Sequence, residues 1–118
     1  MSRWSLTLRN GPRIERARFD TLPAAVDALE SRIDELAPQA RRQAIDVFKR
    51  RYDAVRQVVV RGEIAGPTRV LPRVRGGVDL RGDGSAAPNV GRQRRRLIEP
   101  RRGESAAEAL RRTLDGAT

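Results

Sequence analysis

The stretch that decides the fold spans Arg73–Pro100 and reads RVRGGVDLRGDGSAAPNVGRQRRRLIEP. Its first part, Val74–Arg81, alternates apolar or small residues with mostly charged ones, which is the period-two pattern of a strand with one buried face. Residues 82–85, Gly-Asp-Gly-Ser, tolerate the positive φ angles that a tight reversal requires. We expect the return strand at about Asn89–Glu99, in which residues 92–96 are the most basic part. The stretch therefore predicts a β-hairpin with a strongly basic second strand.

A second hairpin is expected at the N-terminal end, over residues 3–19. Apolar and polar residues alternate from Trp4 to Leu8, and Asn10-Gly11 is a strong signal for a hairpin turn. The return strand spans Ile14–Phe19, but Ile14 does not fit its alternation. We therefore expect a bulge or the start of the strand at that residue.

Two helices are expected after this hairpin, over residues 22–37 and 39–51. In the first helix an apolar residue recurs every three or four positions, which is typical of a helix packed with one side on a sheet. Pro38 lacks the backbone N–H and clashes with the preceding turn, so it is expected to separate the two helices. The apolar stripe of the first helix consists of Leu22, Val26, Leu29, Ile33 and Leu36.

A β-branched run over residues 55–65 predicts a central strand, with Val58, Val60 and Ile64 facing the core. This strand and the basic hairpin form a three-strand segment over residues 55–99. Glycines inside the segment are expected to mark a bulge or a close backbone approach, because no helix start follows them to hold a phosphate.

The last predicted element is a C-terminal helix over residues 104–115. Ser105 and Glu108 have the spacing of a capping box, in which each side chain bonds the other's backbone N–H. The element order is therefore β-β-α-α-β-β-β-α. This order predicts one α+β domain over residues 1–118, with a mostly antiparallel sheet of about five strands and the helices packed on one face.

The charge of the chain is strongly basic, at a net +10, and all but one of its 25 basic residues are arginines. Codon usage in a G+C-rich genome explains the choice of arginine over lysine, but not the excess over acids. That excess is concentrated in residues 61–102, which carry a net +7, against +4 in residues 1–60. A local excess favours an anionic partner. A solvated basic surface or an ordinary protein interface is the alternative.

The chain contains no histidine and no cysteine, which excludes a Ser-His-Asp triad, a disulfide and a zinc site of the usual ligands. Glu63, Asp79 and Asp83 could bind Mg²⁺ in a nuclease-like site. We instead expect Asp79 to pair with a cross-strand arginine and Asp83 to shape the turn. The sequence therefore predicts no catalytic residue, no metal site and no cofactor, so the protein is not expected to be an enzyme.

No segment has the pattern of a signal peptide or of a membrane span. We therefore expect a cytoplasmic location and no membrane partner.

The basic return strand is the predicted binding surface. Arg92, Arg94 and Arg96 share one strand face and Arg95 points the other way, with about 6.6–6.8 Å between alternate residues. That distance comes close to the spacing of phosphates along one nucleic-acid strand. Aromatic residues for base stacking are scarce, so contact to the backbone with little sequence preference is expected. The predicted polyanion-binding residues are Arg75, Arg81, Arg92, Arg94, Arg96, Arg101 and Arg102.

Three functional hypotheses follow from these observations. The first is a small basic binding module, not an enzyme, that contacts nucleic-acid backbone or another polyanion. The second is a protein-interaction or assembly module that binds an acidic protein surface or forms a homodimer, because a free sheet edge can pair with another chain. The third is a carboxylate- and Mg-dependent nuclease.

Overall fold

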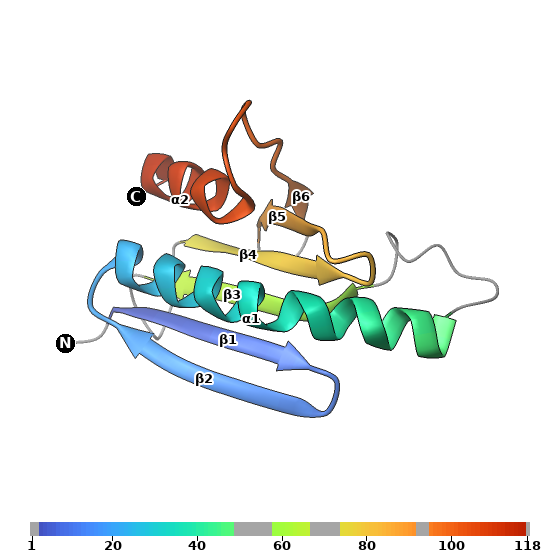
Figure 1. Ribbon diagram of the computed structural model, residues 1–118. Helices are drawn as coiled ribbons and strands as arrows, with labels where there is room; N and C mark the ends of the chain where they lie inside the picture. The colour runs from blue at the N-terminus through green and yellow to red at the C-terminus, as the bar shows by residue number, and fades with distance from the viewer. Residues whose placement is uncertain (1–2, 49–57, 67–73, 92–94, 118) are drawn as a thin grey trace.

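The protein folds as one α+β domain, in which two helices lie on one face of a six-stranded antiparallel sheet (Figure 1). The computed structural model describes residues 3–48, 58–66, 74–91 and 95–117. The predicted fold class is confirmed, with six strands in place of about five. The elements are β1 (Trp4–Asn10), β2 (Arg13–Phe19), α1 (Leu22–Phe48), β3 (Val58–Gly66), β4 (Val74–Arg81), β5 (Ala86–Val90), β6 (Arg96–Leu97) and α2 (Ala106–Ala117).

The strand order of the sheet is β2-β1-β3-β4-β5-β6. The first strand therefore lies between the second and the third, and α1 connects β2 to β3 by passing over the sheet (Figure 1). From β3 onward, each strand pairs with the next one along the chain. The helix α2 then returns to pack on β4 and β5, beside α1.

The N-terminal hairpin is confirmed, and its turn has the residues that a tight reversal needs. Asn10 pairs with Arg13, which leaves two residues for the turn. Gly11 has a φ of +61°, and the ring of Pro12 holds φ near about −65°. These are the signs of φ in a type II′ turn, whose twist suits a two-residue hairpin.

Ile14 is regularly paired, so the bulge considered for this position does not form. It lies directly opposite Arg9, and β2 begins one residue earlier, at Arg13. The start of the strand therefore accounts for the broken alternation. The pairing places Ile14 on the face without helices, where the residue is 47% exposed.

The predicted break between two helices at Pro38 is wrong, because α1 runs without interruption from Leu22 to Phe48. The helix begins after Thr21, whose Oγ1 accepts a hydrogen bond from the backbone N–H of Ala24 at 3.3 Å. Pro38 removes one backbone hydrogen bond, at a cost of about 3 kcal/mol. Strong helix formers and buried core residues flank it on both sides, namely Leu36 and Ala40, so the helix continues through the proline.

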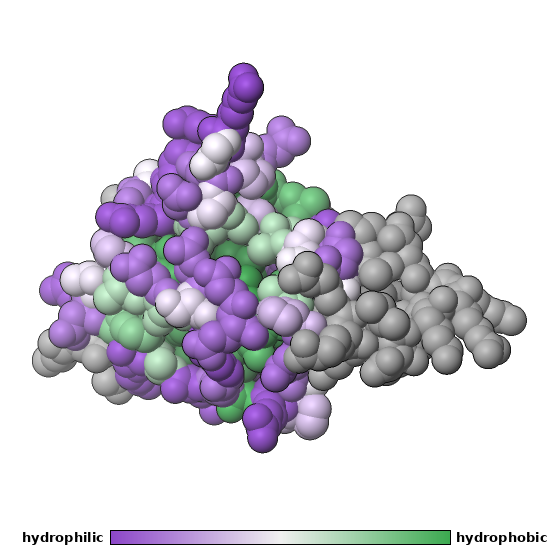
Figure 2. Space-filling view, in the orientation of Figure 1, coloured by the Kyte–Doolittle hydropathy of each residue, from purple (hydrophilic) through white to green (hydrophobic). Residues whose placement is uncertain are grey.

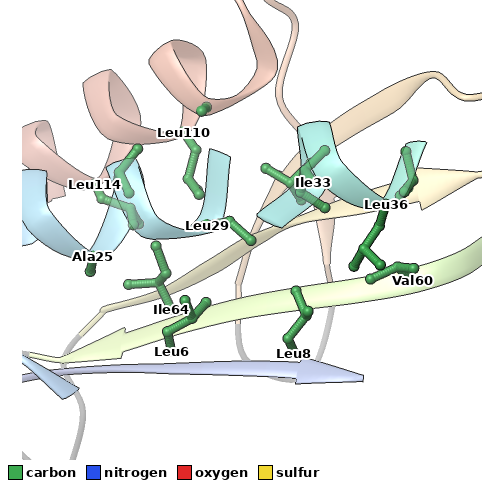
Figure 3. Packing of buried hydrophobic residues seen from close by; sticks show 14 of the residues in the cluster. Leu6, Leu8, Ala25, Leu29, Ile33, Leu36, Val60, Ile64, Leu110 and Leu114 are labelled. Atoms are coloured by element: carbon green, nitrogen blue, oxygen red, sulfur yellow. The ribbon is translucent and has the colours of Figure 1, made fainter. Parts of the chain in front are cut away.

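The predicted apolar stripe of α1 is confirmed and forms the centre of the core. All five of its residues are buried. Figure 3 shows Leu29, Ile33 and Leu36 on the side of α1 that faces the buried residues of β1 and β3. α1 approaches the sheet closely over Gly62, where an added Cβ would overlap Leu29 Cδ1. In the same way a Cβ at Gly76 would lie 2.8 Å from Leu110 Cδ1 in α2. Strand glycines thus let both helices approach the sheet closely, as expected.

The third strand departs from its prediction at one end. Val60 and Ile64 are buried as predicted, but Val58 is 43% exposed. The pairing of β3 with β4 shifts register between Val58 and Val60, which turns the earlier residue out of the core. Residues 55–57 of the predicted strand lie outside the described residues.

The predicted hairpin forms between β4 and β5, but its return strand is shorter than predicted and contains no arginine, so the prediction of a basic second strand is wrong. β5 starts at Ala86, ends at Val90, and is followed by Gly91 at a φ of +126°. Glycine adopts this angle without strain. β6 then pairs antiparallel with β5 as a separate strand. In the turn before β5, Asp83 Oδ1 accepts hydrogen bonds from the backbone N–H and hydroxyl of Ser85 at 2.9 and 2.6 Å, as its predicted turn role requires.

The capping box of the C-terminal helix is confirmed. The backbone N–H of Ser105 donates to Glu108 Oε1 at 3.0 Å, and the N–H of Glu108 donates to Ser105 Oγ at 3.1 Å. The helix that follows is amphipathic and buries Leu110 and Leu114. Within the described ranges, neither helix combines the length and apolar character needed to cross a membrane.

Replacing Leu29 by Ala is expected to lower the free energy of unfolding by about 2–5 kcal/mol, because the side chain is fully buried and leaves a cavity. Urea denaturation measures the loss. A loss near zero would contradict the central position of Leu29 in the core.

The contact between Leu29 and Gly62 predicts a coupled pair of substitutions. Gly62→Ala alone should cost about 1–3 kcal/mol, because the new methyl group overlaps Leu29. In the Leu29→Ala background the same change should cost at least about 0.5 kcal/mol less, since the methyl enters the cavity. Gly116→Ala is the matched control, because nothing lies within 4 Å of an added Cβ there. Additive effects of the two core substitutions would contradict the contact.

Candidate functional site

The sheet face opposite the helices is dominated by arginine. Strand residues alternate between faces, and the apolar ones of β1, β3 and β4 face the helices. The pairing register therefore directs the intervening residues of neighbouring strands to the other side. We call this surface the arginine face. Its arginines in the described residues are Arg9, Arg16, Arg18, Arg61, Arg75, Arg81 and Arg95.

Two carboxylates, Glu63 and Asp79, lie among the described residues of this face. Arg61 Nε is 3.1 Å from Asp79 Oδ1, which confirms the predicted cross-strand pair. Glu63 bridges two arginines, with Oε1 3.2 Å from Arg75 Nη1 and Oε2 3.1 Å from Arg95 Nη2. Both acids are therefore engaged by arginines from β3, from β4 and from the residue before β6.

Three arginines at the other side of the face have no ion-pair partner among the described residues. Arg16 and Arg18 are alternate residues of β2, so their Cα atoms are about 6.6–6.8 Å apart. Arg9 lies on the neighbouring strand, directly opposite Arg61. Like charges in such a position destabilise a sheet. An anion placed over this side of the face would relieve that repulsion.

Two buried donors without acceptors add to the hydrogen-bonding capacity of the face. Asn89 of β5 is 4% exposed and pairs with Gly77, which places its side chain on this face. Its Nδ2 group has no hydrogen-bond partner, and neither has the buried Nε of Arg75. A buried donor without a partner costs free energy. Both groups would be satisfied by an oxygen atom.

The predicted binding residues do not all lie on this face. Arg75 and Arg81 belong to it. Arg96 pairs with Val90, whose partner Gly76 lies beneath α2, so Arg96 is on the opposite face. Arg101 and Arg102 are exposed in the loop before α2. Arg92 and Arg94 lie outside the described residues.

The predicted binding residues did not include the arginines of the face that come from the N-terminal hairpin and from β3. The alternation that places Arg16 and Arg18 on one side of their strand was visible, and so was the charged side of β3. The position of β1 between β2 and β3 could not be predicted from the sequence. That pairing brings Arg9 opposite Arg61.

Hydrogen bonds lower the pKa of two carboxyl groups outside the face. Bonds from the hydroxyl and backbone N–H of Ser85 lower the pKa of Asp83. Glu104 accepts two bonds from the Arg112 guanidinium, both at 3.0 Å, and one from the backbone N–H of Arg101 at 2.9 Å. These contacts, the guanidinium first, lower the pKa of Glu104 to about 2 and fix the loop before α2 onto that helix.

Across the described ranges, no group of three or more carboxylates comes together in a way that could hold a metal ion. Comparison of the chain with protein-family models, curated proteins and solved structures finds no match.

The lowered pKa of Glu104 predicts how its pair with Arg112 responds to pH. Because the folded pKa of about 2 lies below the ordinary 4.5, the stabilisation is complete well above pH 4.5 and is lost as the pH falls toward about 2. The melting temperature of Glu104→Gln should therefore lie below that of the wild type at neutral pH, with the difference shrinking on acidification.

Thermal unfolding between pH 7 and pH 2, followed by circular dichroism, measures this difference. Glu99→Gln in the same loop is the control for the loss of one carboxylate. A difference for Glu104→Gln that is constant at all pH values would contradict the ion pair.

Proposed function

We propose that this chain is a small, non-enzymatic binding module that holds the sugar-phosphate backbone of nucleic acid on the arginine face. The observation that carries the proposal is the group of arginines without ion-pair partners in the described residues, Arg9, Arg16 and Arg18, beside Arg61. Guanidinium groups on alternate residues of a flat strand can each contact a phosphate, and arginine offers a planar pair of donors for it.

The protein should contact the bound strand through its phosphates and not through its bases. None of the described residues of the arginine face is aromatic, so the face offers no platform for base stacking. Contacts to phosphate carry no sequence information. We therefore expect weak sequence preference and a Kd of about 10⁻⁴–10⁻⁶ M at physiological salt. A nucleic-acid partner also agrees with the cytoplasmic location expected from the sequence.

The two carboxylates of the face favour binding over hydrolysis. A metal-dependent nuclease needs carboxylates that are free to hold the cation. Glu63 and Asp79 instead neutralise Arg61, Arg75 and Arg95. An acidic protein surface remains the alternative occupant, because carboxylates also suit arginine.

Removing the unpaired arginines should weaken binding in a salt-dependent way. The triple variant Arg9→Gln, Arg16→Gln, Arg18→Gln should lower the slope of log K against log salt by about 2 for single strands, because each lost phosphate contact removes about 0.7. The measurement is fluorescence anisotropy with random-sequence single-stranded DNA and RNA across a salt titration.

The matched control for the triple variant is Arg96→Gln, Arg101→Gln, Arg102→Gln, which removes the same charge away from the arginine face. It should change the slope by less than half as much. Equal losses in both triples would show that net charge, and not this face, controls binding. Polyglutamate as competitor tests the alternative: if it displaces nucleic acid completely at equal charge concentration, an acidic protein becomes the better partner.

Releasing the paired arginines should have the opposite effect. Glu63→Gln frees Arg75 and Arg95 from their shared carboxylate, so affinity for single-stranded DNA should rise by about two- to tenfold at low salt. Glu99→Gln removes the same charge in the loop before α2 and should change affinity less. Unchanged affinity in Glu63→Gln would contradict contact between the nucleic acid and the centre of the face.

A further inference from the structure

The strand β2 is a free edge of the sheet. It is the terminal strand in the order, and residues 13–18 are all exposed. Such an edge presents unpaired backbone donors and acceptors to another extended chain. Proline is a common protection for an edge, but none lies within β2, since Pro12 precedes the strand in the turn. Among the described residues, the edge is therefore open to pairing with another strand.

The two faces of this edge differ in chemistry. On the arginine face it carries Arg16 and Arg18. On the helix face, Ala17 and Phe19 border a groove of about 190 Å³ between β1, β2 and α1. The groove has an apolar floor that includes Leu6 and Leu8. On the side of the molecule that carries α1, Figure 2 shows apolar surface left between hydrophilic residues.

A cluster of ion pairs lies at one end of the groove. Glu15 projects from β2 on the helix face, and its Oε2 lies 2.7 Å from Arg32 Nη2 of α1. Arg32 also bonds Glu35 at 2.7 Å. Because Arg32 already pairs with two carboxylates, a further carboxylate beside Glu15 would meet like charge. The apolar part of the groove lies toward Ala17 and Phe19.

A second copy of this chain is a poor occupant of the edge. In an antiparallel pair of β2 strands, Arg16 would lie opposite Arg16, Arg18 or Ile14, depending on the register. No carboxylate lies on that face of the strand, so the arginines would meet like charge or gain no partner. Charge complementarity instead requires an acidic strand.

We propose that β2 accepts an extended segment of another protein, in which acidic and apolar residues alternate, as a seventh strand of the sheet. The acidic residues lie beside Arg16 and Arg18, and the apolar residues cover Ala17 and Phe19 at the mouth of the groove. Backbone hydrogen bonds supply affinity, and the alternating side chains supply specificity. The surface is the strand edge and the groove, so the proposal does not depend on nucleic-acid binding.

The test uses the full chain and a fluorescein-labelled peptide of about ten residues that alternates Glu and Val, matching the two faces of the edge. Three control peptides separate the contributions. A peptide alternating Lys and Val has the wrong charge, and a block peptide with the Glu residues first and the Val residues last keeps composition without alternation. A third peptide, N-methylated at every second residue, keeps charge and alternation but cannot pair along its edge. Anisotropy should detect the alternating Glu/Val peptide, with each control weaker by at least about tenfold.

Two substitutions of the protein identify the site. Ala17→Glu places a carboxylate where the apolar residues of the peptide should lie. It should weaken binding of the Glu/Val peptide by about tenfold or more. Ala24→Glu makes the same change at an exposed position of α1 and should have little effect. The double reversal Arg16→Glu, Arg18→Glu should exchange the preference, so that the Lys/Val peptide binds better than the Glu/Val peptide. Circular dichroism checks that each variant is folded.

Binding of the N-methylated peptide as tight as that of its parent would overturn strand addition. Equal loss in Ala17→Glu and Ala24→Glu would overturn the position of the site. These outcomes are independent of the nucleic-acid titration, since the N-methylated peptide and Ala17→Glu leave the charges of the arginine face unchanged. A failure of the peptide experiment with intact nucleic-acid binding, or the reverse, therefore distinguishes the two proposals.

Discussion

The close approach of two helices to the sheet over glycine is the constraint on which the rest of the structure depends. Leu29 of α1 lies on Gly62, and Leu110 of α2 lies on Gly76, at distances that a Cβ atom would not permit. The large side chains of the helices thus reach the strand backbone directly. Gly62 and Gly76 both lie at positions of the helix-covered sheet face, so both helices pack on the same side of the sheet. The charged strand residues are therefore left on the other face.

The asymmetry separates apolar from charged residues across the sheet. One face is buried beneath helices, and the other collects seven described arginines. Their two carboxylates lie on β3 and β4 and pair with Arg61, Arg75 and Arg95. Most of the positive charge left over therefore lies on β1 and β2, with Arg81 at the end of β4 as a further arginine outside these ion pairs. Arg16 and Arg18 border both the arginine face and the edge of β2. The two proposed partners, nucleic-acid backbone and an acidic strand, would therefore contact the same two side chains.

The sequence was most informative where structure is local. The turn at Gly11, the stripe centred on Leu29 and the cap at Ser105 were all predicted, because each depends on residues within a few positions. Pro38 was misjudged, since burial on both sides of it outweighs a local penalty. The return strand ends at Val90, before Gly91 with its φ of +126°, and the neighbouring residues do not reveal that angle.

The site was harder to predict than the fold, because it depends on long-range pairing. Arg75 was predicted as a binding residue, and it does lie on the arginine face. Arg9 and Arg61 come together only because β1 is inserted between β2 and β3. The same limit applies to Arg96, whose face is set by the strand that it pairs with and not by its neighbours in the chain.

Trp4 gives the fold a built-in optical reporter. It is the sole tryptophan of the chain, it is buried, and it lies opposite Phe19. Its indole ring packs against Gly66 at the end of β3. Intrinsic fluorescence excited at the indole therefore comes from one place, where three strands meet. A change in that emission distinguishes separation of the N-terminal hairpin from fraying of the opposite end of the sheet, without a label.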